Sequence, residues 1–228
     1  MCGRFALYTP MGTVVARYFG LSDAPRGDEP RYNVAPGTAI HILQTDAQGS
    51  PRLGPCHWGF RPPGAGEKSP RPINARAEKV ATSPYFRGAF ARHRCLIPAD
   101  GWYEWRQTAQ GRQPYYITLR DPGEAEVIFL AGIHAPGTGV EDGGCAVITE
   151  PARGPLATIH PRQPLALDPT CLQAWLDPDI TERQTLRARI RPLDPARLEI
   201  RPVDTRVNRA GEEGPELIRE RQRGLPAS

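Results

Sequence analysis

The second residue of the chain is a cysteine, and this position gives it chemistry that an internal cysteine lacks. The sequence begins Met1-Cys2-Gly3, and an initiator methionine is readily removed when the next residue is small. Loss of Met1 leaves Cys2 with an α-amine and a thiol on adjacent carbons, whose reference pKa values are about 8 and about 8.5. The amine can condense with an aldehyde to an imine, and the thiolate can then close a thiazolidine ring.

Two other readings of Cys2 stay open at this point. The thiolate can attack an acyl group with the amine as its base, as in an N-terminal-nucleophile peptidase or amidohydrolase, and removal of Met1 can then be self-catalysed. Glutamine amidotransferases also begin Met-Cys-Gly, although this chain leaves no room for a synthetase domain that would receive the ammonia. In a third, non-enzymatic reading the chain is a single-strand binding module and the cysteine is incidental.

Composition bounds the class of protein. The 228 residues suffice for one domain with a real core. No stretch has the apolar length of a membrane span and no signal peptide is visible, so we expect a cytoplasmic protein. Nothing in the sequence suggests more than a monomer. The net charge is +4, and Lys68 and Lys79 are the only lysines among 29 basic residues. Arginine suits phosphate recognition, but a GC-rich genome also enriches it.

The other four cysteines indicate packing and not metal binding. Cys56, Cys95, Cys145 and Cys171 are widely spaced and form no Cys-x-x-Cys pair. A disulfide framework or a zinc site is therefore not expected, and neither is a cofactor. These cysteines are predicted to be small buried apolar residues.

Short β-branched or alternating runs predict strands, and four segments predict helices. The strands are 39–44, 115–119, 126–131, 145–149 and 198–203, and the helices are 12–19, 84–92, 168–176 and 180–190. Segments 21–30, 61–72 and 136–144 are expected to be loops. The mixture predicts an α+β protein with a mainly antiparallel sheet, curled or forming an open barrel, and short helices. One domain is expected over residues 2–218, followed by a flexible tail over 219–228.

Six ordered motifs then resemble one family. They are Met1–Phe5 (MCGRF), Arg31–Thr38 (RYNVAPGT), Trp58–Phe60 (WGF), Ile73–Glu78 (INARAE), Arg94–Trp105 (RCLIPADGWYEW) and Ile159–Pro164 (IHPRQP). Their order and spacing resemble the SRAP family, the SOS response-associated peptidases. The resemblance runs from Cys2 to about Ile218. It implies a single α+β domain with a positively charged groove, and covalent capture of abasic sites in single-stranded DNA through a thiazolidine with the N-terminal cysteine.

The resemblance also implies a set of catalytic residues. Cys2 would be the nucleophile, and Asn74 would hold the opened sugar or the cysteine by its amide. Glu104 would carry protons during ring opening and imine formation, which a carboxylate near an amine can do. His160 titrates near neutrality and would be a second acid–base group, for resolving the crosslink.

The implied DNA contacts are mostly arginines. Arg4, Arg76 and Arg162 would bind phosphates flanking the lesion, and Trp105 would offer a face on which a base stacks. Between Arg71 and Glu104 the basic residues outnumber the acidic ones, which suggests that they line the channel together with Arg4 and Arg162. These basic residues are Arg71, Arg76, Lys79, Arg87, Arg92 and Arg94.

Structural roles compete with several of these assignments. Alternation along a strand would place Glu104 on a solvent face. Asn74 and Arg76 share one face if their segment is extended, and Asn74 could make only a structural hydrogen bond. His160 would by itself be an ordinary structural histidine. Trp58 and Trp102 are expected to fill the core, and Asn33 and Pro36 to shape a turn.

The sequence departs from the family pattern at two places. Family members usually carry another tryptophan shortly after the Trp-Gly-hydrophobic motif, and segment 61–72 has none. An aromatic wedge beside the lesion is therefore in doubt. The segment after His160 usually reads Asp-Arg-Met-Pro, whereas here it reads Pro161-Arg162-Gln163-Pro164. The arginine is kept, and neither change touches Cys2, Asn74 or Glu104.

Overall fold

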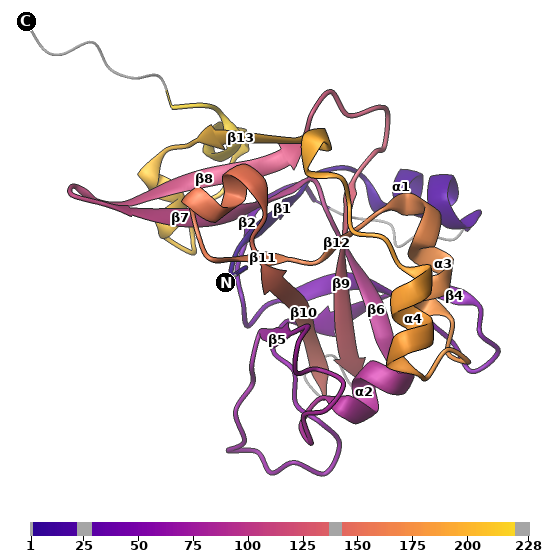
Figure 1. Cartoon of the computed structure of the whole chain (residues 1–228). Coiled ribbons are helices and arrows are strands. Elements are labelled where there is room, and N and C mark those ends of the chain that lie inside the picture. Colours follow the sequence, from indigo (N-terminus) through magenta and orange to yellow (C-terminus); the bar gives the residue numbers. More distant parts are fainter. Residues whose placement is uncertain (1, 22–28, 137–142, 222–228) are drawn as a thin grey trace, which may run out of the picture.

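Strands dominate the molecule and form two sheets (Figure 1). The computed structural model describes residues 2–21, 29–136 and 143–221. Most of the predicted loops 21–30 and 136–144, and most of the predicted tail 219–228, lie outside these ranges. Of that tail the described part includes Arg221, whose backbone N–H donates to the carbonyl of Pro202 at 2.8 Å.

The smaller sheet has the strand order β13-β8-β7-β1-β2, and every pair in it is antiparallel. Its strands are β1 (Phe5–Leu7), β2 (Arg31–Val34), β7 (Gly101–Thr108), β8 (Gly111–Leu119) and β13 (Leu198–Pro202). The N-terminal strand β1 lies in the interior of this sheet, between β7 and β2. The residues just before β1 are therefore held next to β7 and β2.

The larger sheet has the order β11-β10-β9-β6-β3-β4, with β12 paired to β9 and β5 to β10. Its strands are β3 (Ala39–Thr45), β4 (Pro51–His57), β5 (Asn74–Arg76), β6 (Arg94–Ala99), β9 (Ile128–Ala135), β10 (Gly144–Pro151), β11 (Arg162–Pro164) and β12 (Ala166–Leu167). Its pairs are antiparallel except that β5 runs parallel to β10.

The helices are short, and α2, α3 and α4 lie together beside β6, β9 and β10 (Figure 1). The α-helices are α1 (Met11–Phe19), α2 (Arg87–Arg92), α3 (Leu172–Leu176) and α4 (Arg183–Arg189), and the 3-10 turns are η1 (Gly154–Thr158), η2 (Pro169–Cys171), η3 (Pro195–Arg197), η4 (Thr205–Asn208) and η5 (Pro215–Ile218). Three of these turns begin after an aspartate whose carboxylate accepts a backbone N–H two residues ahead, namely Asp168, Asp194 and Asp204. Such caps satisfy a donor that the helix cannot.

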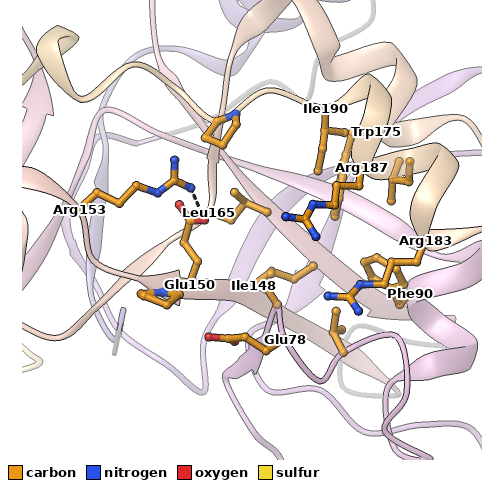
Figure 2. Close-up of a pocket in the computed structure, with 15 residues that line it drawn as sticks. Glu78, Phe90, Ile148, Glu150, Arg153, Leu165, Trp175, Arg183, Arg187 and Ile190 are labelled. Atoms are coloured by element: carbon orange, nitrogen blue, oxygen red, sulfur yellow. Dashed lines mark hydrogen bonds and ion pairs between the residues drawn. The ribbon is translucent and has the colours of Figure 1, made fainter.

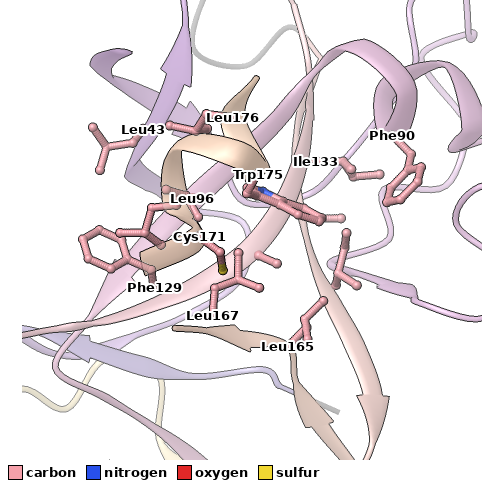
Figure 3. Close-up of a cluster of buried hydrophobic side chains, with 14 of the residues drawn as sticks. Leu43, Phe90, Leu96, Phe129, Ile133, Leu165, Leu167, Cys171, Trp175 and Leu176 are labelled. Carbon is pink, nitrogen blue, oxygen red and sulfur yellow. The ribbon is translucent and has the colours of Figure 1, made fainter. Parts of the chain in front are cut away.

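Central strands of the larger sheet are buried on both faces, and side-chain alternation divides them between two cores. On β9, Phe129, Ala131 and Ile133 join the core under the helices, where Trp175 and Leu176 also pack (Figure 3). Ile128 and Leu130, one residue out of phase, join the core between the two sheets. The continuous apolar run on β9 therefore serves two cores.

The predicted α+β class, mainly antiparallel with short helices, is confirmed. The five predicted strands correspond to β3, β8, β9, β10 and β13, and segment 61–72 contains neither helix nor strand. Three helices differ in extent, and the one predicted over 180–190 begins at Arg183 and ends at Arg189. The segment predicted over 84–92 becomes helical only at Arg87, and the one over 168–176 is divided into η2 and α3.

Aromatic and cysteine burial also follows the sequence. Trp58 and Trp102 are buried, as expected of core residues. All five cysteines are free and buried, which confirms the apolar packing role of the four internal ones. The prediction that Asn33 shapes a turn is wrong. Asn33 lies in strand β2, and its buried side chain forms hydrogen bonds to distant segments.

Candidate active site

Cys2 lies in the core between the two sheets, with none of its surface exposed. Its carbonyl oxygen accepts a hydrogen bond from Nδ2 of Asn74 at 2.9 Å. Burial raises the pKa of the Cys2 thiol, the Glu104 charge raises it further, and the backbone N–H of Arg4 lowers it. The thiol is therefore protonated at neutral pH, and a nearby proton acceptor is needed to form a thiolate.

Asn74 reaches Cys2 because of the register of β5. Asn74 and Arg76 pair with Val147 and Thr149 of β10, while Ala75 between them points into the core under the helices. Asn74 and Arg76 consequently share the opposite face, as the sequence spacing predicts. The Oδ1 atom of Asn74 is buried and has no hydrogen-bond partner among the described residues. Such an acceptor is available to a bound group.

Glu104 lies on β7, two residues after Trp102, so both side chains point to the inner face of that strand. Only 3% of Glu104 is exposed, which excludes the solvent-face alternative. Burial raises the pKa of this carboxyl to about 7. At neutral pH the group is therefore divided between its acid and base forms, the condition under which a carboxyl transfers protons best.

His160 follows η1 and approaches the same carboxylate. Its Nδ1 lies 3.9 Å from Oε2 of Glu104, and it is within hydrogen-bond distance of both the carbonyl and the backbone N–H of Arg162, at 2.9 and 3.0 Å. Burial lowers the pKa of this imidazole, so the neutral form prevails at pH 7. Cys2, Asn74, Glu104 and His160 thus come from four separate segments and gather at one end of the core between the sheets.

Arg76 and Arg162 flank this cluster and differ in their surroundings. Arg76 is exposed on β5. Arg162 lies on β11 and forms a two-pronged ion pair with Glu78, with a further bond to the carbonyl of Thr149. Its Nε is buried and has no acceptor within the part of the chain that the structure describes. A phosphate at Arg162 would therefore meet one spare donor and a competing carboxylate.

Arg4 and Trp105 contact the C-terminal part of the chain. Arg4 Nη1 donates to Oδ1 of Asn33 and to the carbonyl of Val207, both at 2.7 Å. Trp105 Nε1 donates to Oδ1 of Asn208 at 2.6 Å. Trp105 packs with Tyr103 on the outer face of β7, opposite to Glu104.

Arg94 does not line a channel, contrary to the expectation from its place among the basic residues. Only 3% of it is exposed, and its guanidinium donates to main-chain carbonyls, including those of Phe90 and Trp175 at 2.9 and 2.7 Å. The cation caps the ends of α2 and α3, where carbonyls lack helical partners. Arg94 is the first residue of the buried strand β6, and nothing in the local sequence signals this role.

A hollow of about 590 Å³ lies on the other face of β10, under α4 (Figure 2). Ile148, Leu165 and Trp175 line it, and Arg183 and Arg187 point across it. Cys2, Asn74, Glu104 and His160 are not among its lining residues. Within residues 2–21, 29–136 and 143–221, no three His, Cys, Asp or Glu side chains lie close enough to hold a metal ion.

Comparison with known proteins identifies the family of this chain. The family model of SRAP, SOS response associated peptidase, matches residues 1–210. The chain belongs to the SRAP family. It is 34% identical over 229 residues to the abasic site processing protein YedK of Escherichia coli, covering 96% of this chain and 99% of that protein. It is 32% identical over 225 residues to the abasic site processing protein YoqW of Bacillus subtilis, with the same coverage.

The SRAP fold is also seen in solved structures. A crystal structure of a protein from Bacteroides thetaiotaomicron superposes with a TM-score of 0.80, covering 97% of this chain and all of that one at 21% identity. At this identity the likeness concerns the fold alone. No described helix of this SRAP chain is both long and apolar enough to cross a membrane.

Proposed function

We propose that this protein captures abasic sites in DNA covalently, through a thiazolidine formed by Cys2 after loss of Met1. The observation that carries the proposal is the buried meeting of Cys2, Asn74 and Glu104, in which the Glu104 carboxyl has a pKa of about 7. The relatives YedK and YoqW are named abasic site processing proteins, and the family match places this chain with them.

The chemistry requires proton transfer at each step. An abasic sugar must open so that its C1′ becomes an aldehyde. The Cys2 amine attacks that carbon and water leaves, giving an imine, and the Cys2 sulfur then attacks the imine carbon while a proton passes to nitrogen. Glu104 in its acid form protonates the departing oxygen, and in its base form it accepts the thiol proton. The free Oδ1 of Asn74 accepts a hydrogen bond from the amine or a sugar hydroxyl.

Single-stranded DNA is the proposed partner, bound by a monomer. A single strand can bend freely around an abasic nucleotide, because no complementary strand holds its backbone in a duplex, so the sugar can enter a buried site. Arg76 is exposed on the same face of β5 as Asn74, and Arg162 adds a spare buried donor. Both are proposed to bind phosphates next to the lesion, and Trp105 is proposed to stack with a neighbouring base. The proposed SRAP domain spans residues 2–218.

Two finer activities belong to the same proposal. Neutral His160 beside Glu104 supplies a second proton acceptor for reopening the ring, which would release the DNA. Self-catalysed removal of Met1 would use the Cys2 thiol and Glu104 on the preceding peptide bond. Amide hydrolysis of other substrates remains the competing function for the same nucleophile.

Intact-protein mass spectrometry tests the proposal. The purified protein is incubated with an oligonucleotide that carries one abasic site, and with the same oligonucleotide without the lesion. The expected adduct has the mass of the protein lacking Met1 plus the intact oligonucleotide, less one water. A chain that keeps Met1 and still forms the adduct would exclude a thiazolidine at Cys2. Absence of any adduct would leave hydrolysis as the better explanation of the site.

A further inference from the structure

The segment that carries the nucleophile is held at three points. The carbonyl of Cys2 accepts from Asn74, and the carbonyl of Arg4 accepts the backbone N–H of Tyr103 at 3.0 Å. The third point is the Arg4 side chain, which reaches Asn33 and the carbonyl of Val207. Chain termini usually fray unless they are tied down. Once Met1 is lost, these contacts, together with the burial of the Cys2 side chain, position the Cys2 amine.

Asn33 is the residue that connects the Arg4 side chain to its surroundings at this third point. Its side chain is 2% exposed, and its Oδ1 accepts from Arg4 at 2.7 Å. Its Nδ2 donates to the carbonyls of Arg209 at 2.9 Å and Glu212 at 3.0 Å, with a longer contact to Val207 at 3.3 Å. A single buried amide therefore joins the N-terminal segment, β2 and the residues that follow η4.

The C-terminal partner of Asn33 is docked firmly on the smaller sheet. Val203, Val207 and Leu217 are fully buried against Tyr103 and Tyr116 on the outer face of that sheet. Segment 205–213 is therefore a fixed support, and Arg4 is bonded to it. Some of the N–H donors of the Arg4 guanidinium are therefore bonded to protein acceptors, and fewer of them can bind a phosphate.

We propose that Asn33 is a positioning residue for covalent capture: through Arg4 it fixes the Cys2–Arg4 segment to segment 205–213, so that Cys2 is held beside Glu104. The inference rests on the proposed function, because the reaction that needs this alignment is the one proposed above. In this proposal the main role of Arg4 is to bind Asn33 and segment 205–213 within the protein, and not to bind a DNA phosphate. A misplacement of about 1 Å at a reacting group can reduce a rate by about a hundredfold.

The test separates rate from affinity. Asn33→Ala and Arg4→Met are compared with the parent for the maximal rate of adduct formation at saturating abasic DNA, for the half-saturating concentration, and for the pH dependence of the rate. Both variants are expected to lower the maximal rate by roughly tenfold to a hundredfold. Their half-saturating concentrations should stay close to that of the parent. The inflection that Glu104 contributes near pH 7 should weaken.

Glu213→Ala is the matched control. The Glu213 carboxylate accepts the backbone N–H of Tyr32 at 2.6 Å, so it joins the same C-terminal segment to the same strand without touching Arg4. This variant should keep the parent rate and pH profile. An equal loss in Glu213→Ala would mean that general docking of the segment matters and would overturn the assignment to Asn33. Thermal unfolding of each variant shows whether it folds. If Asn33→Ala folds poorly, Arg4→Met still tests the proposal, because it removes the Arg4–Asn33 bond and keeps the Asn33 bonds to Arg209 and Glu212.

Two further outcomes decide between alternatives. A contrary outcome is that Arg4→Met raises the half-saturating concentration and leaves the maximal rate unchanged, with the slope of log affinity against log salt concentration (the salt slope) reduced by about 0.7. In that outcome Arg4 is a phosphate ligand and the positioning role is wrong. Reaction of Cys2 with a small aldehyde, glyoxylate, needs no DNA and is measured alongside. If the parent reacts with glyoxylate faster than Asn33→Ala but never with abasic DNA, the proposed function fails while the positioning role stands. Equal glyoxylate rates would overturn the positioning role.

Discussion

The two faces of the larger sheet are built from the same strands and differ in what they bury. The face under α2, α3 and α4 buries an apolar set that includes Leu96, Phe129 and Trp175 (Figure 3), and the buried Arg94 beside Trp175 donates to main-chain carbonyls. The face towards the smaller sheet covers Cys2, and the core on that side also holds buried polar groups, among them Thr149 of β10 and Glu104 of β7. Apolar packing tolerates local adjustment, whereas a buried polar group requires a partner in a particular direction.

This difference predicts opposite behaviour on substitution. Changes on the helix-covered face should cost stability and leave the chemistry of folded molecules intact. Changes at the polar end of the other face should remove chemistry and cost little stability, or even increase it. The buried Oδ1 of Asn74 illustrates the second case, because a buried acceptor without a partner costs about 1–3 kcal/mol until a ligand satisfies it.

The largest effect is expected for Cys2→Ala. This variant should form no heat-stable DNA adduct, since its amine can give only a reversible imine and no thiol remains to close the ring, and weak binding of single-stranded DNA should persist. Cys2→Ser should react far more slowly, because an alkoxide forms less readily than a thiolate. Heat-stable adduct on a denaturing gel is the measurement. Adduct at the parent level in Cys2→Ala would refute the central role of this residue.

Glu104→Gln keeps the shape of the side chain and removes its titration. It should slow adduct formation by about 10²–10⁴ without weakening initial DNA binding. The parent rate should change around pH 7, where Glu104 titrates, and the variant should lose that dependence. The measurement is a time course of adduct formation across pH 5–9. A variant with the parent rate and profile would make Glu104 structural.

The same variant tests stability with a defined sign. Burial raises the pKa of Glu104 from 4.5 to about 7, so its charged form is disfavoured in the folded state. The parent should therefore lose stability relative to Glu104→Gln as pH rises through this window, by at most about 3 kcal/mol. Denaturant unfolding at pH 4.5 and pH 8 measures the difference. A difference in stability between parent and variant that does not grow as pH rises would contradict a raised pKa for Glu104.

Phe129→Ala tests the helix-covered face. Phe129 is fully buried, and its ring lies 4.8 Å from that of Tyr18 and 6.1 Å from that of Phe19. The substitution should lower the free energy of unfolding by about 3–5 kcal/mol. The adduct rate, normalised to the folded fraction, should match the parent. A lower normalised rate would show that the two faces of the sheet are coupled.

Arg76→Ala should have a moderate effect on binding. Arg76 is exposed beside Asn74, so its loss should weaken non-covalent binding of single-stranded DNA and reduce the salt slope by about 0.7. Arg183→Ala on α4 removes another exposed arginine, which borders the hollow across the sheet. It serves as the control and should leave the slope unchanged. Equal losses in both variants would indicate a diffuse basic surface.

The smallest effect is expected for His160→Gln. His160 lies 3.9 Å from Glu104 and is neutral at pH 7, so its loss should leave adduct formation largely intact. Release of DNA should slow when a competing aldehyde scavenger is added, because one proton acceptor for ring reopening is gone. The measurement is a time course of the remaining adduct after the scavenger is added to preformed adduct. Equal release in parent and variant would assign His160 a structural role only.

Much of the fold follows from local patterns. Alternation and β-branching located β3, β8, β9, β10 and β13, and the helix predicted over 168–176 begins as η2 at Pro169. Strands as short as β1 and β5, with three residues each, give too brief a pattern to be recognised alone. The spacing of Asn74 and Arg76 predicted their shared face. It could not predict which core that face meets, because this depends on the pairing of β5 with β10.

By itself the sequence determined the chemical inventory: an aminothiol at Cys2 once Met1 is removed, acid–base groups at Glu104 and His160, and an excess of arginine over lysine. Only the tertiary structure decided which of these groups meet and in what state. Burial between two sheets raises the pKa of Glu104 to about 7. Long-range contacts commit Arg94 to carbonyls and Arg4 to Asn33. Desolvation and partner direction are properties of the assembled chain, and no local pattern encodes them.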